Sequence, residues 1–505
     1  MKKLIISLSI LMVLTGCKKS FLDVNQNPNT PGATRADFAF TGAAITHANT
    51  MLAPHQLGGA WTGIYGFSTS FTGGGQQKTY VFSNSDFNFW DPIFDNITDY
   101  NYVVDNAVKD GYGYLVGPAI IMRSFQYQKL VDAYNNIPYY EAFHITTDVT
   151  PSYTNGQVVY EDLIKKIDSA IALIKATTFP ASAPEDIVFK GNKTNWIKLA
   201  NTLKLRMLIR QSLMPGRASY ITTEINKITT EGTGLLTTNV FINPGYQKAT
   251  GKLNPFYANL GYNENDVEQQ NHRFYKVGSF LIDYLKTTKD TFRLQRKADM
   301  KVQGNNGNKD DFSNYVGVNL GQRSGATETT VSSIGSSLIT KGEATRPMVF
   351  FTAAESYFLQ AEAAQRFGLL GSAETNYNNG VIESFKLDAG NGTSPSPTAT
   401  TAAATAKANQ YLASGLDNVT FSASTNKIQA IITQKWIALA NYDNYETWTE
   451  WRRTGFPPVP LSDQAQAAQP RRLYYPLSEQ NTNLENYNKE GTISPYTSRI
   501  FWDVR

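Results

Sequence analysis

The chain has 505 residues, of which 41% are hydrophobic and 17% charged, so it can bury a substantial core and lacks the composition of a disordered protein. Its formal net charge is +4, and this near-balance argues against a nucleic-acid-binding protein, which would show a concentrated basic surplus. A single cysteine excludes a disulfide framework and any metal site built from several thiolates.

The N-terminal residues have the features of a secretory signal. Lys2 and Lys3 precede an apolar stretch, residues 4–14, that is too short to span a bilayer but suits the hydrophobic region of a signal peptide. The stretch ends in Leu-Thr-Gly-Cys, which resembles a bacterial lipobox, with Cys17 as the residue that is lipidated and becomes the mature N-terminus. The alternative is an ordinary signal peptide with a cysteine near its cleavage site. Cys17 is the only cysteine of the chain and stands where lipidation needs it, so we favour the lipobox.

This interpretation divides the chain into three segments. We expect residues 1–16 to be a lipoprotein signal peptide and residues 17–36 to be the acylated cysteine with a polar, Asn- and Pro-rich tether. Residues 37–505 would form one domain, because the helical patterns of its C-terminal part resemble those of its N-terminal part. Stable anchoring by acyl chains needs no membrane-spanning helix, and we find no later stretch that is long and apolar enough to be one.

Helical periodicity dominates the mature chain, since apolar residues recur along one face at a spacing of 3.6 residues. The pattern predicts helices over 117–134, 159–174, 194–213, 277–287, 353–367, 374–386 and 426–451. Thr194 and Ser424 are the predicted N-caps of two of these helices. Many helices fall in consecutive pairs with short polar breaks, although no strict 34-residue repeat is present. We therefore predict a mainly α fold: tetratricopeptide-like helix pairs form a scaffold that carries long irregular loops and a few short strands.

Long stretches without helical pattern separate these helices, at 57–90, 232–275 and 300–345. Long irregular loops in a compact domain are usually functional or disordered, so we expect the helices to be the scaffold and the loops to be the working surface. Residues 389–404 are of low complexity, and we expect a mobile surface loop there.

Several sequence blocks, in the same order along the chain, resemble the SusD/RagB family of surface nutrient-binding lipoproteins of Bacteroidota. They are FLDVNQNPN (21–29), YNNIPYYEA (134–142), NKTNWIKLANTLKLRMLIR (192–210), AAESYFLQAEAAQRFG (353–368), ETWTEWRR (446–453) and RRLYYP (471–476). Asn136 departs from the family pattern, which has a glycine-containing step in the second block. The likeness extends from the lipobox almost to the C-terminus.

The resemblance implies a non-catalytic protein that is lipid-anchored in the outer membrane, faces the cell exterior and needs no cofactor. Such a protein captures an oligosaccharide, or a peptide in some relatives, and passes it to a TonB-dependent SusC-like outer-membrane barrel, for which it acts as a lid. The partners implied are that barrel, the glycan and the membrane lipid that holds Cys17.

The charged and aromatic residues of these blocks also have a structural interpretation. Trp436, Trp448 and Trp451 are predicted to anchor the core, and Glu355 and Glu362 to pair with buried arginines rather than to act as catalytic acids. Cations near a helix C-terminus, as at Arg452 and Arg453, complement the helix dipole.

A glycan site combines exposed aromatic rings, on which the apolar faces of sugars stack, with amides and charged groups for the hydroxyls. Two loop segments have this composition, 57–90 and 256–275. Our candidates in the first are Trp61, Tyr65 and Tyr80 as platforms with Gln76 and Gln77 as polar partners, and in the second Tyr257, Tyr262 and Arg273.

No sequence signature of a catalytic or phosphate-binding site is present. The run 263–266 (Asn-Glu-Asn-Asp) and the pair Asp310-Asp311 offer oxygen ligands for Ca²⁺, but solvated loop acids are the simpler interpretation, and we expect no metal. Two alternative functions stay open. A surface glycoside hydrolase would need two carboxylates about 5–10 Å apart beside an aromatic cleft, and a purely structural helical adaptor would bind no small molecule.

Overall fold

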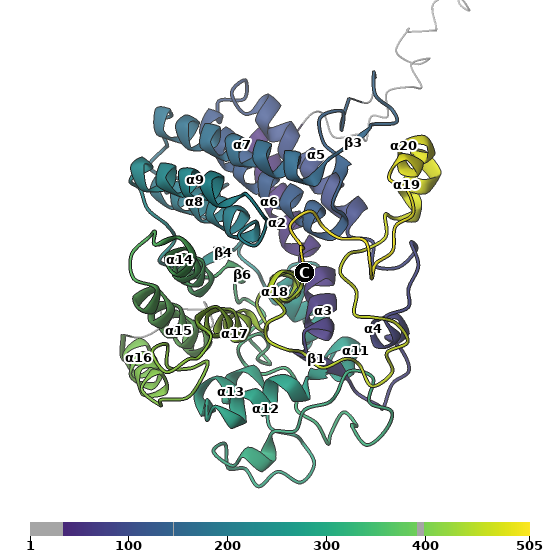
Figure 1. Ribbon diagram of the computed structural model, residues 1–505, viewed down its shortest axis with the longest axis vertical. Coiled ribbons are helices and arrows are strands. Elements are labelled where there is room, and N and C mark those ends of the chain that lie inside the picture. The colour runs from purple at the N-terminus through teal and green to yellow at the C-terminus, as the bar shows by residue number, and fades with distance from the viewer. Residues whose placement is uncertain (1–33, 145, 391–397) are drawn as a thin grey trace, which may run out of the picture.

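The computed structural model describes residues 34–144, 146–390 and 398–505, and helices dominate it (Figure 1). The predicted signal peptide, Cys17 and most of the tether lie outside the described residues, as do residues 391–397 of the low-complexity segment.

Helices of the N-terminal half form one layer at one end of the long axis of the molecule (Figure 1). Successive members pack side by side: the first against the second, the second against the third, and so on to the last. They are α2 (Ala36–Thr50), α5 (Trp90–Asn106), α6 (Val116–Tyr134), α7 (Gly156–Ala176), α8 (Lys193–Arg210) and α9 (Ala218–Glu231).

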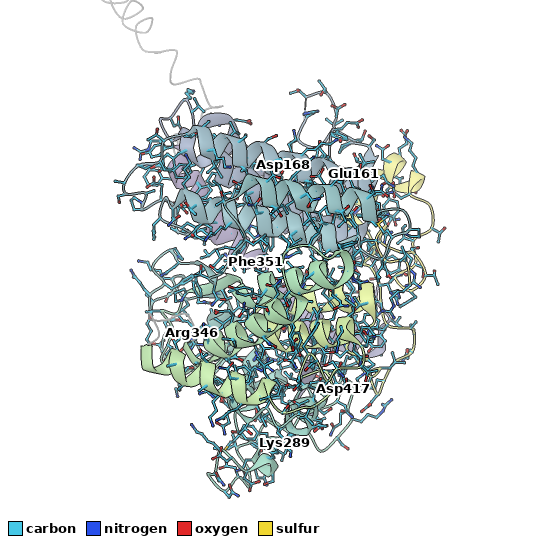
Figure 2. All side chains as sticks on the ribbon, turned by 60° about the vertical axis from the view of Figure 1, so that its left-hand side comes forward. Glu161, Asp168, Lys289, Arg346, Phe351 and Asp417 are labelled. Atoms are coloured by element: carbon cyan, nitrogen blue, oxygen red, sulfur yellow. The ribbon has the colours of Figure 1, made fainter. Side chains whose placement is uncertain are left out.

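A second group of helices packs below this layer, and Figure 2 shows Phe351, at the end of strand β6, between the two groups. α14 contacts α15, α15 contacts α16, and α17 packs on α14 and α15. The predicted stacking of helix pairs is thereby confirmed. The bounds are α14 (Ala353–Phe367), α15 (Ala373–Gly390), α16 (Thr398–Leu412) and α17 (Lys427–Leu439).

Short helices and three two-stranded antiparallel sheets occupy the segments between these groups. The strands pair as β1 (Tyr65–Phe67) with β5 (Tyr275–Val277), β2 (Ile137–Pro138) with β3 (Tyr153–Thr154), and β4 (Val240–Ile242) with β6 (Met348–Phe351). The remaining helices are α3 (Leu52–Trp61), α4 (Gly75–Thr79), α10 (Pro255–Leu260), α11 (Gln270–Phe274), α12 (Ser279–Thr287), α13 (Thr291–Lys297), α18 (Asn444–Thr454), α19 (Leu477–Thr482) and α20 (Leu484–Lys489), with 3₁₀ turns at Gly113–Leu115 and Phe312–Asn314.

The single helix predicted over 426–451 is wrong, because the chain breaks between α17 and α18. Asn441 has a φ of 75°, which ends the first helix. Asp443 then caps the second by accepting a hydrogen bond from the backbone N–H of Glu446 (3.2 Å), as an N-cap aspartate does. Continuous apolar periodicity across the break concealed it.

Both predicted N-caps are also wrong, since asparagines two residues away from them perform that role. The side chain of Asn192 accepts from the N–H of Asn195 (3.0 Å), and that of Asn426 accepts from the N–H of Gln429 (3.1 Å). Asparagine caps as well as serine or threonine does, so the sequence signal fitted neighbouring positions equally well.

Part of the predicted loop at 389–404 is helical, because α15 extends to Gly390 and α16 begins at Thr398. Ala404 and Ala408 lie one helical turn apart and are both fully buried against the lower group of helices. Their small side chains let α16 approach its neighbours closely, which low complexity alone did not reveal.

Buried ion pairs join α14 to α8 of the other group and to α18. Arg206 on α8 pairs with Glu355 on α14 (3.0 Å), and Arg453 on α18 makes two hydrogen bonds to Glu362 on α14 (2.8 and 2.7 Å). All four side chains are almost completely buried. The prediction that these glutamates pair with arginines is confirmed, and so is the burial of Trp436 and Trp448, whereas Trp451 is only half-buried.

Candidate functional site

The two loop segments that the sequence analysis selected meet in the structure. β1 from the first pairs with β5, which begins at the last residue of the second, with Phe67 opposite Tyr275. The rings of Phe67 and Phe274 stack beside this pairing, with centroids 4.6 Å apart. The aromatic residues of both segments thus pack largely on each other, and this packing covers ring faces on which a sugar could otherwise stack.

Trp61 and Tyr80 are core residues and not exposed platforms. Trp61 is completely buried, and its ring packs edge-on against Trp448 at 5.1 Å and against Tyr80 at 6.4 Å. The Tyr80 hydroxyl accepts a hydrogen bond from the N–H of Ser462 (2.9 Å), and burial raises its pKa to about 12. The expectation that sugars stack on these two rings is corrected: aromatic composition did not distinguish core from surface.

Tyr65 and Tyr257 are buried too. The Tyr65 hydroxyl bonds to the Nε2 of His55 (2.9 Å) and donates to Asn441 (3.1 Å), and burial raises its pKa. The Tyr257 hydroxyl accepts from the N–H of Gly342 (3.1 Å). Each tyrosine fixes a loop by its hydroxyl, and neither ring is an exposed platform, although Tyr65 is among the residues that line the pocket described below.

The other four candidates remain on the surface but do not form one site. Gln76 is exposed and donates to Asp86 (3.2 Å), while Gln77 is half-buried. Tyr262 is half-buried beside the ring of His272 (5.2 Å). The guanidinium of Arg273 is engaged by both carboxylate oxygens of Glu328 (2.6 and 3.1 Å), which raises its pKa.

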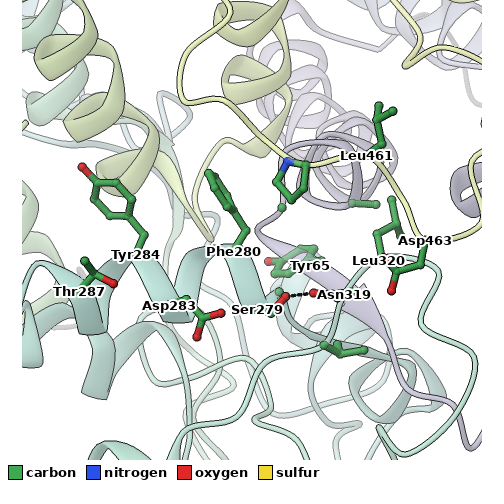
Figure 3. Close-up of a pocket in the computed structure, with 15 residues that line it drawn as sticks. Tyr65, Ser279, Phe280, Asp283, Tyr284, Thr287, Asn319, Leu320, Leu461 and Asp463 are labelled. Atoms are coloured by element: carbon green, nitrogen blue, oxygen red, sulfur yellow. Dashed lines mark hydrogen bonds between the residues drawn. The ribbon is translucent and has the colours of Figure 1, made fainter. Parts of the chain in front are cut away.

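A pocket of about 430 Å³ opens between α12 and the C-terminal segment (Figure 3). Gly63 and Gly278 line the pocket, and together with the neighbouring Gly317 they let three backbone segments approach closely. The N–H of Gly278 donates to the carbonyl of Ile64 (2.7 Å). A Cβ at Gly278 would lie 2.3 Å from the carbonyl oxygen of Gly63, and one at Gly317 would lie 2.3 Å from the Cα of Ser279. Only glycine fits at these two positions.

Two aromatic rings lie side by side along α12. Phe280 and Tyr284 are one helical turn apart, both half-buried, and Figure 3 shows them projecting on the same side of the helix. The buried ring of Trp436 supports them from behind, with centroids 5.3 Å from Phe280 and 6.0 Å from Tyr284. Partial burial raises the pKa of Tyr284, so its hydroxyl stays protonated and can donate a hydrogen bond.

Polar groups surround these rings. Ser279 is hydrogen-bonded to Asn319, as the dashed line in Figure 3 shows. Asp283 and Thr287 are exposed on α12, and Asp463 is exposed on the C-terminal segment. The lining contains no lysine and no arginine, so its charge comes from the two carboxylates.

The C-terminal wall of the pocket is held in place by buried groups. The N–H of Asp463 donates to the carbonyl of Leu320 (2.9 Å), as does the Ser462 hydroxyl (3.1 Å). The Tyr80 hydroxyl accepts from the N–H of Ser462 on the same segment. Leu461, 58% exposed, lies on this wall, across the opening from Tyr284 (Figure 3). A residue predicted to bind the ligand therefore supports the wall of the pocket instead.

α12 lies within the helix predicted over 277–287, but none of its residues was among the predicted site residues. Leu281, Ile282 and Leu285 form its buried stripe, and Phe280 and Tyr284 lie off that stripe. An aromatic pair at i and i+4 outside the core-facing positions is the signal that pointed to a surface role.

The acidic loop residues considered for Ca²⁺ have protein partners. Asp266 pairs with Lys248 (2.5 Å), and Asp310 accepts from Gln295 (2.8 Å). Across residues 34–144, 146–390 and 398–505 there is no group of three or more His, Cys, Asp or Glu side chains placed to hold a metal ion.

The chain thus has a mainly helical fold, and a pocket with aromatic and polar lining opens between α12 and the C-terminal segment. Residues 28–476 match the SusD-like family, described as starch-binding and associating with the outer membrane, and the chain belongs to that family. Among the helices of the described residues, none is long and apolar enough to cross a membrane. A search of curated proteins gave no match.

Solved structures of SusD homologues share the fold. A SusD homologue from Bacteroides fragilis is 19% identical with a TM-score of 0.75 and covers 93% of this chain and 99% of its own. An outer membrane protein from Bacteroides vulgatus, described as probably involved in nutrient binding, is 23% identical with a TM-score of 0.74 (93% and 100%). A chitin-binding SusD homologue from Flavobacterium johnsoniae is 22% identical with a TM-score of 0.72 (92% and 99%).

Proposed function

We propose that this protein binds an oligosaccharide in the pocket between α12 and the C-terminal segment. The observation that carries the proposal is the pair of rings, Phe280 and Tyr284, beside polar groups on both sides of the opening. Neighbouring rings offer a stacking surface for the apolar faces of consecutive sugar units. Ser279, Asn319 and the two aspartates supply hydrogen-bond partners for the hydroxyls.

The charge of the lining favours a neutral or amino sugar over an acidic one. Asp283 and Asp463 accept hydrogen bonds from hydroxyl or ammonium groups and repel a carboxylate or sulfate. The family-level description as starch-binding supports a neutral glycan, and the chitin-binding relative is a second precedent for a glycan ligand.

Calorimetric titration of the soluble form, residues 18–505, with maltohexaose, chitohexaose and xylohexaose tests the proposal. We expect one of these to bind, and Tyr284→Ala or Phe280→Ala to weaken binding by about 1–3 kcal/mol, or roughly 5- to 150-fold, with the melting temperature little changed. Phe38→Ala is the matched control, because Phe38 is 63% exposed on α2 in the other helical layer. Equal affinities for the wild type and the α12 variants would contradict the proposal.

We further propose that Cys17 is acylated, that the protein is held at the outer face of the outer membrane, and that it delivers the glycan to a TonB-dependent SusC-like barrel. The lipobox-like residues and the outer-membrane association of the family support this. Cys17→Ala should release the protein from the membrane fraction, and continued membrane association would contradict lipidation. Copurification of a large barrel protein from native envelopes tests the partnership.

A surface glycoside hydrolase is the alternative with a structural argument, because Asp283 and Asp463 both line the pocket. Both are exposed, whereas the general acid of such enzymes normally lies in a buried, apolar environment. We therefore propose binding without catalysis. Release of shorter products from labelled oligosaccharides, abolished by Asp283→Asn or Asp463→Asn, would establish the enzyme instead. A peptide ligand would show itself by binding from a peptide panel when no glycan binds.

A further inference from the structure

A second pocket, of about 410 Å³, lies on the helical scaffold, away from the loops that form the first. Its walls are α5, α6, α7 and the segment that follows β2. Figure 1 places α5 and α7 at one end of the long axis and α12 at the other. Figure 2 shows the same separation, with Glu161 and Asp168 of α7 near the top and Lys289, just after α12, near the bottom. The two pockets are separate sites.

Three tyrosines form a continuous series at this second pocket. Tyr127 is buried on α6, and its ring contacts that of Tyr139 edge-on at 4.8 Å. Tyr139 in turn contacts Tyr140 at 5.0 Å. Tyr140 is 54% exposed, so its ring is open to a ligand while the two rings behind it restrict its movement. The exposed ring of Tyr140 therefore offers a stacking surface, which the buried rings of Trp61, Tyr65 and Tyr80 do not.

Hydrogen-bond donors and acceptors face the same space. Arg123 donates to the amide oxygen of Asn101 (2.5 Å), the only acceptor that its guanidinium reaches among the described residues. One carboxylate oxygen of Asp162 accepts from the Tyr139 hydroxyl (2.7 Å), which fixes the carboxylate and leaves its second oxygen without a hydrogen-bond partner in the described part of the chain. Lys166 is exposed at the rim.

This set of groups matches a sugar better than it matches an ion. Each hydroxyl of a sugar both donates and accepts, so a site for it needs carboxylates together with cations or amides. The lining has two carboxylates, Asp105 and Asp162, and two cations, Arg123 and Lys166, so the charges balance and neither an anion nor a cation is favoured. An exposed tyrosine beside such a balanced set is the composition of a site for a neutral sugar unit.

We propose that this pocket is a second saccharide-binding site, which holds one or two neutral sugar units with Tyr140 as the stacking ring and Arg123 and Asp162 as hydroxyl partners. This inference rests on the proposed function only in that it takes a saccharide to be the ligand. Two sites on one chain raise the effective concentration of a long glycan at the second site once the first is occupied. A polysaccharide would thus be retained at the surface while one segment of it enters the first pocket.

Titration of residues 18–505 with maltose, cellobiose, N,N′-diacetylchitobiose and xylobiose, followed by crystal soaking with the same four sugars, tests the proposal. We expect one of these sugars to occupy two sites, and Tyr140→Ala to remove the second by lowering its affinity at least about fivefold. Tyr140→Phe is the matched control, because it keeps the ring and should keep binding. Arg123→Met should weaken the same site and leave the first unchanged.

The outcomes separate this inference from the proposed function. The inference is supported if the wild type has two sites, Tyr284→Ala keeps only the site at Tyr140, and Tyr140→Ala keeps only the site at Tyr284. A single site that Tyr284→Ala removes and Tyr140→Ala does not affect overturns the second site and leaves the first standing. Binding that only Tyr140→Ala removes overturns the proposed function and supports the second site. No binding by any of the four sugars overturns the second site, while the proposed function is decided by the titration with hexasaccharides.

Discussion

The charged groups inside the helical scaffold and those around the α12 pocket differ in what surrounds them. In the scaffold, Arg453 and Glu362 are buried and form a bidentate ion pair with two hydrogen bonds. Around the pocket, Asp283 and Asp463 are exposed. A buried charge without a partner costs much of the stability of a protein, whereas an exposed charge is solvated and free to meet a ligand. We therefore expect substitutions in the first region to change stability and substitutions in the second to change binding.

A large effect on stability should come from Arg453→Met. It removes the buried cation that Glu362 and Glu450 share, while Arg366 and Arg210 remain as their other partners. We expect a loss of about 3 kcal/mol in the free energy of unfolding, measured by denaturant titration. The affinity of the folded fraction for its glycan should be unchanged. Lys489→Met is the control, because its pair with Glu485 is exposed, and a surface pair contributes little. Similar losses in both variants would contradict the contrast between interior and surface.

Trp61→Ala tests the same contrast at a residue that sequence composition placed in the ligand site. The ring fills space among Trp448, Tyr80 and Phe87, so its removal leaves a cavity, and we expect a loss of stability of about 3–5 kcal/mol. Binding should survive in the folded protein. Weakened binding at unchanged melting temperature would mean that Trp61 contacts the ligand after all.

Acid should destabilise the interior, and His55 provides a defined test. Burial, with the charge of Lys129 in addition, lowers the pKa of His55 from 6.5 to about 3. Between these two values the unfolded chain takes up a proton that the folded protein does not, so the stability that the neutral histidine contributes is present above pH 6.5 and is lost as the pH falls toward 3. His55→Gln should flatten the dependence of unfolding free energy on pH in this window.

The lowered pKa of Glu362 also makes the protein less stable in acid, but at lower pH than His55 does. The arginines at positions 453 and 366 lower it to about 2, against the opposing effect of burial, so its contribution is present above about pH 4.5 and is lost as the pH falls toward 2. A pH profile of His55→Gln identical to that of the wild type between 6.5 and 4.5 would contradict the assignment to His55, because this upper part of the window lies above the range of Glu362.

The smallest effect should come from the charges at the pocket. Asp283→Asn combined with Asp463→Asn removes the repulsion of acidic groups, and we expect the affinity for an acidic oligosaccharide such as hexagalacturonate to rise by less than about tenfold, because exposed charges interact weakly. The unfolding free energy should hardly change. Calorimetric titration at low salt checks this. An unchanged affinity for the acidic oligosaccharide would show that the charge of the lining does not determine the class of ligand.

How far the sequence predicted the structure depends on the kind of signal. The helix predicted over 117–134 is observed as 116–134, because its apolar positions have one consistent spacing. The break at Asn441 was missed although Asp443 and Glu446 form a recognisable capping signal. Local signals were sufficient for both, and the second was hidden by the stronger apolar pattern around it.

The candidate site was harder to predict because burial is a property of the assembled fold. Trp61 and Tyr284 are both aromatic, and aromatic composition alone does not separate them; only the position of Tyr284 outside the buried stripe of its helix does. Trp61 lies where α3 meets α18, far along the sequence, and it is buried by residues that the sequence places almost four hundred positions away. Tyr284 lies on the outer side of its helix with one buried ring behind it.

By itself the sequence determined the helical class, the pairing of successive helices and the likeness to one family, because these depend on periodicity and on short blocks read along the chain. Only the tertiary structure decided which aromatic rings are buried, that β1 and β5 bring two distant segments together, and that α12 and the C-terminal segment enclose a pocket. These features depend on contacts between residues far apart in the chain, and such contacts leave no spacing in the sequence that local patterns can reveal.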